Sequence, residues 1–99
     1  MSRRFADLLE RQLDLFAADN RKLVEEAEAA LRAYDDAPRE EAEERYGEFV
    51  DLADTGGELL VELREAYAES LDEATAEEYR HAFDARARKR FPRFSLELD

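Results

Sequence analysis

Apolar side chains recur at alternating spacings of four and three residues through two long stretches of the chain. Such a repeat, as in a coiled coil, keeps one stripe of a helix facing a partner helix over many turns. The first stripe is Leu9, Leu13, Phe16, Asn20, Leu23, Ala27, Ala30 and Tyr34, and the second is Ala42, Tyr46, Phe49, Ala53, Gly56, Leu60, Leu63 and Tyr67. We therefore expect two helices, at about residues 3–35 and 38–71, with a turn before Pro38.

The two stripes match when the chain is folded into an antiparallel hairpin that turns near Pro38. In that register, bulky residues near the turn face small ones, as interdigitated packing requires. Asn20, the polar residue of the first stripe, then lies opposite Gly56, the glycine of the second. We expect this pair to fix the register of the hairpin. The alternative is that Asn20 lies at the edge of the stripe, in water.

The segment Asp54-Thr55-Gly56-Gly57-Glu58 raises the question of whether the second helix is continuous. Thr55 and Glu58 have the spacing of a capping box, and two glycines cost about 2 kcal/mol in a helix interior, which favours a break. The apolar stripe nevertheless continues in phase from Tyr46 to Tyr67, and a break would normally shift it. We expect one continuous helix that is weakened locally.

A third, shorter helix is predicted at residues 76–91. Thr75 and Glu78 have the spacing of a capping box at its start, and Pro92 disfavours its continuation. The alternating apolar and polar residues of the tail, 94–99, predict either an extended segment or a cover that folds back over the helices.

These elements define an all-α fold, a long antiparallel helical hairpin plus a shorter third helix. This three-helix bundle forms one domain at residues 1–91, followed by an extended tail at residues 92–99. Because the third helix is too short to cover the wide apolar face of the hairpin, we expect that face to bind a second copy, giving a homodimer, or another protein. The side chains expected at this surface are Val24, Leu31, Val50, Leu59, Phe94, Leu96 and Leu98.

Composition supports the helical assignment and narrows the classes of function. The chain has 99 residues, of which 42% are charged and only three are Gly and two are Pro. Its net charge of −12 argues against general binding to nucleic acid or to an anionic membrane. It has no cysteine, so it has no disulfide framework or thiolate chemistry. With no signal peptide or membrane-length apolar run, we expect a cytoplasmic protein.

The charge is unevenly distributed along the chain. Residues 1–79 carry nine basic and twenty-four acidic side chains, whereas residues 80–99 carry six basic and three acidic ones. Basic residues interleaved with Phe83, Phe91 and Phe94 could hold phosphates and stack bases. We expect instead that this basic segment docks on the acidic hairpin of its own chain, with a protein partner or a nucleic acid as the alternatives.

Glu78 and His81 form a Glu-x-x-His pair, a spacing that places two metal ligands on one helix face in di-iron bundles. A metal-binding, ferritin-like bundle is therefore the alternative interpretation. The chain has a single histidine, however, and no carboxylate occupies a stripe position in either long helix. We expect no catalytic, cofactor or metal site, and a non-enzymatic protein that acts in protein–protein interaction as a scaffold or regulatory subunit.

Overall fold

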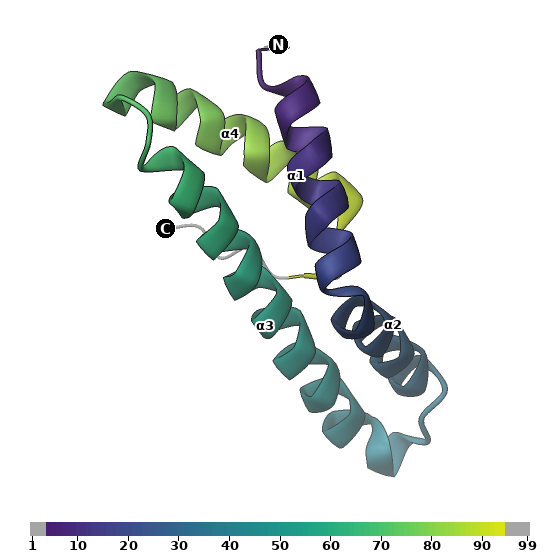
Figure 1. Ribbon diagram of the computed structural model, residues 1–99. Coiled ribbons are helices and arrows are strands. Elements are labelled where there is room, and N and C mark those ends of the chain that lie inside the picture. Colours follow the sequence, from purple (N-terminus) through teal and green to yellow (C-terminus); the bar gives the residue numbers. More distant parts are fainter. Residues whose placement is uncertain (1–3, 95–99) are drawn as a thin grey trace.

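The computed structural model describes residues 4–94, and in this part of the chain all regular secondary structure is helical, without a strand (Figure 1). Its α-helices are α1 (Ala6–Asp19), α2 (Arg21–Asp35), α3 (Ala42–Ala68) and α4 (Glu73–Arg90). A 3-10 turn, η1 (Arg39–Glu41), joins the α2–α3 connection to α3. The described residues thus form four α-helices, where the hydrophobic pattern predicted three.

The additional helix arises because the first predicted helix is divided at Asn20, where φ is −119° and ψ is 31°. The side-chain amide of Asn20 donates a hydrogen bond to the carbonyl oxygen of Phe16 at 3.0 Å, and the backbone N–H of Asn20 donates to the same oxygen at 2.9 Å. A side chain that enters the helical hydrogen-bond ladder is a known cause of a kink. The single helix expected at residues 3–35 is therefore wrong, and α1 changes direction relative to α2 (Figure 1).

α3 is one continuous helix through Gly56 and Gly57, as the phase of its stripe predicted. The hydroxyl of Thr55 donates to the carbonyl oxygen of Asp51 at 2.9 Å, so it bonds within the helix and does not cap a new one. α2 and α3 lie side by side along most of α2 and make the most extensive contact between elements (Figure 1).

α4 begins at Glu73, three residues before the predicted start, because Asp72 caps it. The Asp72 carboxylate accepts hydrogen bonds from the backbone N–H of Thr75 at 2.9 Å and from the Thr75 hydroxyl at 3.0 Å. These bonds lower the pKa of the Asp72 carboxyl. Thr75 is therefore the third residue of the helix and not its cap, which corrects the predicted capping box.

The core lies where α1, α4 and the C-terminal half of α3 meet. Its largest fully buried side chains are Leu9, Leu13, Leu60, Tyr79 and Phe83. The Tyr79 hydroxyl donates a hydrogen bond to Oε1 of Gln12 at 2.8 Å, so the buried phenol is satisfied. The rings of Phe5 and Tyr67 lie against the Tyr79 ring, with centroids 5.4 and 4.8 Å away. One aromatic side chain of α4 thus joins α1 to α3.

Ion pairs fix α4 against α3 at the edge of this core. Arg64 and Asp84 form a hydrogen-bonded pair at 3.0 Å, and their side chains are only 12% and 16% exposed. Arg80 binds Glu65 through two guanidinium nitrogens, each at 2.9 Å from a carboxylate oxygen. The Arg80 bonds lower the pKa of the Glu65 carboxyl.

Residues 28–51, which we call the arm, extend beyond this core as two antiparallel helices joined by the turn at Pro38 (Figure 1). Ala27 is the last residue of α2 in the hydrophobic core cluster, and Leu52 is the first residue of α3 packed against it. The radius of gyration is 15.3 Å, above the value of about 13 Å expected for a compact domain of this length. The arm is the reason for this elongation.

Candidate functional site

The arm carries a group of apolar side chains that the rest of the described chain leaves partly exposed. The rings of Tyr34 and Tyr46 lie with centroids 5.1 Å apart, and those of Tyr46 and Phe49 with centroids 6.3 Å apart. Tyr34 is 36% exposed and Tyr46 is 50% exposed. Together with their neighbours they form the arm patch, which consists of Leu31, Tyr34, Tyr46, Phe49 and Val50.

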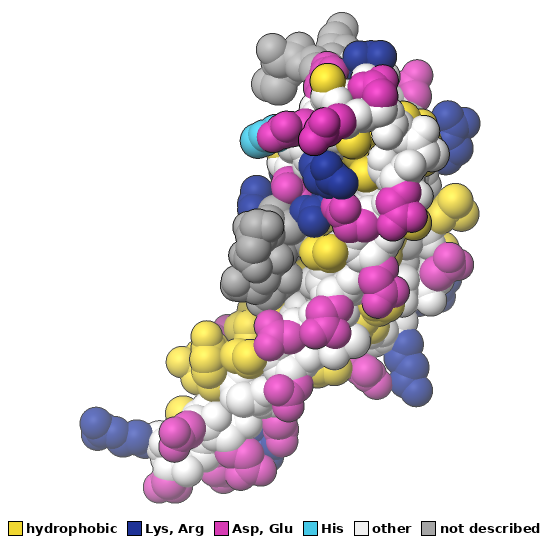
Figure 2. Space-filling view, turned by 90° about the vertical axis from the view of Figure 1, so that its left-hand side faces the viewer, with side chains coloured by type: hydrophobic (Ala, Val, Ile, Leu, Met, Phe, Trp, Pro, Cys, Tyr) yellow, Lys and Arg dark blue, Asp and Glu magenta, His cyan; other side chains and the backbone are white. Residues whose placement is uncertain are grey.

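The local geometry explains why the arm patch stays exposed. Leu31 lies one helical turn before Tyr34, and Val50 lies one turn after Tyr46, so both extend the aromatic cluster along its helices. Two helices alone bury only the stripe between them, and a third element is needed to cover the side chains at its edge. Figure 2 shows hydrophobic side chains gathered on one side of the lower part of the molecule, which is the arm, next to acidic side chains.

The side chains predicted to bind a partner lie in different environments. Leu31 and Val50 are partly exposed on the arm. Val24 and Leu59 are partly buried and pack against the core cluster. Phe94 is only 7% exposed and belongs to that cluster, whereas the predicted tail residues Leu96 and Leu98 lie outside the described residues.

Phe94 is buried because the chain after α4 folds back onto α3. A Cβ atom added at Gly56 would lie 2.5 Å from two carbons of the Phe94 ring, so only glycine leaves room for the ring at that position. The rings of Phe16 and Phe91 adjoin it, with centroids 6.3 and 5.9 Å away. Phe94, the first residue of the predicted tail, therefore packs onto the helices, and residues 95–99 lie outside the described part of the chain.

The register role expected of Asn20 and Gly56 stays a prediction. The structure adds a specific contact for each residue: the Asn20 amide bonds to the carbonyl oxygen of Phe16, and Gly56 accommodates the ring of Phe94. Both contacts lie on the side of the molecule where the end of α1 meets the fold-back, since Phe16 and Phe94 are themselves in ring contact.

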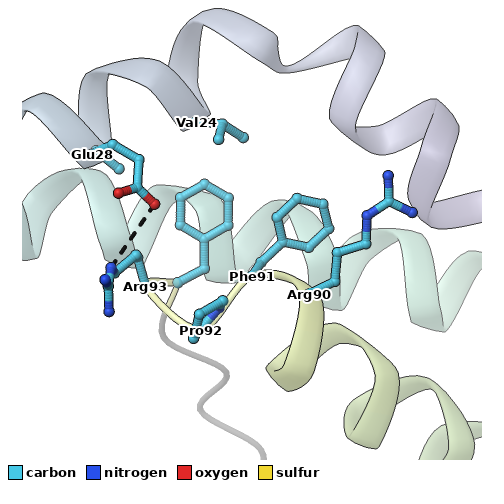
Figure 3. Close-up of a pocket in the computed structure, with 8 residues that line it drawn as sticks. Val24, Glu28, Arg90, Phe91, Pro92 and Arg93 are labelled. Atoms are coloured by element: carbon cyan, nitrogen blue, oxygen red, sulfur yellow. Dashed lines mark ion pairs between the residues drawn. The ribbon is translucent and has the colours of Figure 1, made fainter.

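A pocket of about 120 Å³ lies beside the fold-back (Figure 3). Its lining residues are Val24, Ala27, Glu28, Arg90, Phe91, Pro92, Arg93 and Phe94. It is smaller than the roughly 300 Å³ at which small-molecule sites begin. Arg93 lies 3.9 Å from Glu28, and Arg90 pairs with Asp14, so carboxylates of the same chain neutralise both of its cations. These properties do not favour a ligand site.

The basic segment at the end of α4 docks in part on its own chain, as expected from the uneven charge. Arg80 pairs with α3 through Glu65, Arg90 with α1 through Asp14, and Arg93 with α2 through Glu28. The basic side chains at the end of α4, Arg86, Arg88, Lys89 and Arg90, are exposed.

The geometry around Glu78 and His81 does not resemble a metal centre. Among residues 4–94, no group of three or more His, Cys, Asp or Glu side chains is placed to hold a metal ion. Glu78 forms an ion pair with Arg4 at 3.2 Å, and His81 is exposed.

Comparison of the chain with protein-family models, with curated protein sequences and with solved structures gave no significant match. In the part of the chain that the structure describes, no helix combines the length and the apolar character needed to cross a membrane. The arm patch is the surface feature that calls for a functional explanation.

Proposed function

We propose that this chain is a cytoplasmic, non-enzymatic interaction protein that binds another protein surface through the arm patch, as a scaffold or regulatory subunit. The observation that carries the proposal is the exposure of Tyr34 and Tyr46, in ring contact, on a two-helix arm outside the core. Contiguous exposed apolar side chains rimmed by polar ones are typical of protein–protein contact sites. The covering surface is either a second copy, giving a homodimer, or a different protein.

The free energy available from covering the two tyrosines is substantial. A buried aromatic side chain removes about 200 Å² from water. Tyr46 is 50% exposed and Tyr34 is 36% exposed, so covering both removes roughly 170 Å², which contributes about 4 kcal/mol at 25 cal/mol per Å². Tyrosine is also enriched among the residues that dominate binding energy at interfaces. The arm patch can therefore anchor a complex.

Two matched variants test this proposal. Tyr46→Ser removes the most exposed ring of the arm patch, and Leu15→Ser removes a large apolar side chain that is 61% exposed on α1, away from the arm. We expect Tyr46→Ser to abolish concentration-dependent self-association in sedimentation velocity, or to lose a stoichiometric protein that co-purifies with the chain from its own cells. Leu15→Ser should keep the self-association or the co-purifying protein that the unmodified chain shows.

Circular dichroism should show unchanged helix content in both variants, because neither side chain belongs to the core cluster. A chain that stays monomeric at all concentrations, and whose co-purifying proteins are the same with and without Tyr46→Ser, contradicts the proposal.

A further inference from the structure

The charge around the arm patch specifies the polar chemistry of its partner. Residues 28–51 carry nine acidic and three basic side chains. The ion pairs of the arm within residues 4–94 are those of Arg45 with Glu41 and Glu48, and that of Glu28 with Arg93. The other acidic side chains of the arm are exposed to solvent, and Figure 2 shows acidic side chains next to the hydrophobic ones of this part of the molecule. A partner with Lys or Arg beside its apolar side chains is attracted to this surface, and an acidic one is repelled.

The shape of the arm patch fits a helix. Its side chains extend along about one turn of α2 and one turn of α3, which lie antiparallel and expose the edge of their common stripe. The opposite end of α3 shows how such an edge is covered, because α4 lies there and its Tyr79 contacts Tyr67 of α3 at 4.8 Å between ring centroids. An amphipathic helix laid in the groove of two others is a common mode of recognition.

A second copy of the chain does not supply this helix. In a symmetric dimer with one arm patch facing another, two arms that each carry a net charge of −6 would lie together. The basic helix of the chain, α4, cannot turn an apolar face outward either, because its Ala76, Tyr79, Phe83 and Ala87 are buried in the core.

We infer that the arm patch binds an amphipathic helix with a cationic polar face that belongs to a different protein, an inference that rests on the proposed function. The apolar stripe of that helix covers Tyr34 and Tyr46, and its Lys or Arg side chains meet the acidic rim of the arm. The affinity of the partner helix for the arm patch depends on both its apolar stripe and its positive charge, so the affinity falls when either is removed.

The test uses a fluorescein-labelled peptide of Leu and Lys, roughly five helical turns or 18 residues long, with leucines at helical spacing on one face. Two control peptides accompany it: one of the same composition in scrambled order, and one in which Glu replaces Lys and the stripe is kept. Fluorescence anisotropy with the full chain measures binding. We expect the Leu/Lys peptide to bind at least about tenfold more tightly than either control, and added KCl to weaken its binding, because salt screens the attraction.

Chain variants locate the binding surface. We expect Tyr46→Ser to weaken binding of the Leu/Lys peptide about tenfold and Leu15→Ser to leave it unchanged. Equal binding of the Leu/Lys and scrambled peptides, or undiminished binding to Tyr46→Ser, overturns the inference.

Self-association of the chain separates this inference from the proposed function. If the chain associates with itself through Tyr46 and does so more tightly as KCl rises, salt is screening the repulsion between two acidic arms, and the occupant is a second copy. That result overturns the inference that the partner is a cationic helix, and it agrees with the proposed interaction function. If neither the peptide, nor a second copy, nor any cellular protein binds in a way that depends on Tyr46, both fail.

Discussion

Replacing Gly56 by alanine tests whether the ring of Phe94 is seated on α3. The added Cβ would lie 2.5 Å from Cγ and Cδ1 of Phe94 and 2.6 Å from Cδ2. Carbon atoms in contact are separated by about 3.5 to 4.0 Å, so the ring has to move by about 1 Å. The short segment after α4 carries the ring, and it yields more easily than the backbone of the long helix α3.

Two opposing free energies determine the size of the effect. Burial of a phenylalanine side chain stabilises a fold by about 1.5 to 3 kcal/mol, and displacing the ring loses much of that, including its contacts with Phe16 and Phe91. Alanine in place of glycine in a helix interior stabilises by about 1 kcal/mol. We therefore expect Gly56→Ala to destabilise the protein by about 1 kcal/mol.

Gly47 is the matched control within the same helix. Nothing lies within 4 Å of a Cβ added at Gly47, so only the favourable backbone effect applies. We expect Gly47→Ala to stabilise by about 1 kcal/mol. Urea denaturation followed by far-ultraviolet circular dichroism measures both changes, whose signs should be opposite.

A double-mutant cycle assigns the cost to the ring itself. In a Phe94→Ala background there is no ring to displace, so Gly56→Ala should become stabilising by about the same amount as Gly47→Ala. If Gly56→Ala stabilises the unmodified chain as much as Gly47→Ala does, Phe94 is not seated at Gly56. If Gly56→Ala destabilises the protein equally with and without the Phe94 ring, that ring is not the cause of the lost stability.

Three further predictions concern the core, the ion pairs and a helix cap. Burial raises the pKa of Tyr79 to about 12, so the stability that its neutral phenol confers is complete below an unfolded-state pKa of about 10 and is lost as the pH rises from about 10 to 12. Urea titrations near pH 11 should show a loss of stability on the order of 1 kcal/mol that Tyr79→Phe abolishes and Tyr46→Phe does not. Arg64→Met leaves Asp84, only 16% exposed, without its ion-pair partner and should destabilise by about 3 kcal/mol. Calorimetry should show no comparable change for Arg45→Met, which removes two exposed ion pairs, with Glu41 and Glu48. Asp72→Ala removes the hydrogen bonds to Thr75 and should lower the thermal midpoint, whereas the neighbouring Glu73→Ala should leave it unchanged. An unchanged midpoint for Asp72→Ala would mean that the cap does not stabilise α4.

The features that could be predicted from the sequence depend on residues close together in the chain. The continuity of α3 followed from the phase of its stripe through Gly56, and the end of α4 followed from Pro92. The kink also had a local signal, because Asn20 is a polar residue within an apolar stripe. The pattern did not predict that the Asn20 amide bonds to the Phe16 carbonyl oxygen within its own helical ladder, as asparagine side chains often do.

The candidate site was harder to predict. Tyr34 and Tyr46 are stripe positions of the apolar repeat, as the buried Leu60 is, so the pattern assigned all three side chains to a core. Whether a stripe residue is buried depends on which third element reaches it, and α4 packs only on the other end of the hairpin. The reverse holds for Phe94, which was expected on the surface and is buried over Gly56.

The sequence by itself determined that the chain is helical, that α3 is unbroken and that a turn before Pro38 separates two long apolar stripes. Hydrophobic spacing and proline act over a few residues, so their effects can be recognised along the chain. Only the tertiary structure decided that α1 packs against α4, that Phe94 closes over Gly56 and that the arm patch stays uncovered. Each of these features depends on contacts between residues far apart in the chain, which no local pattern contains.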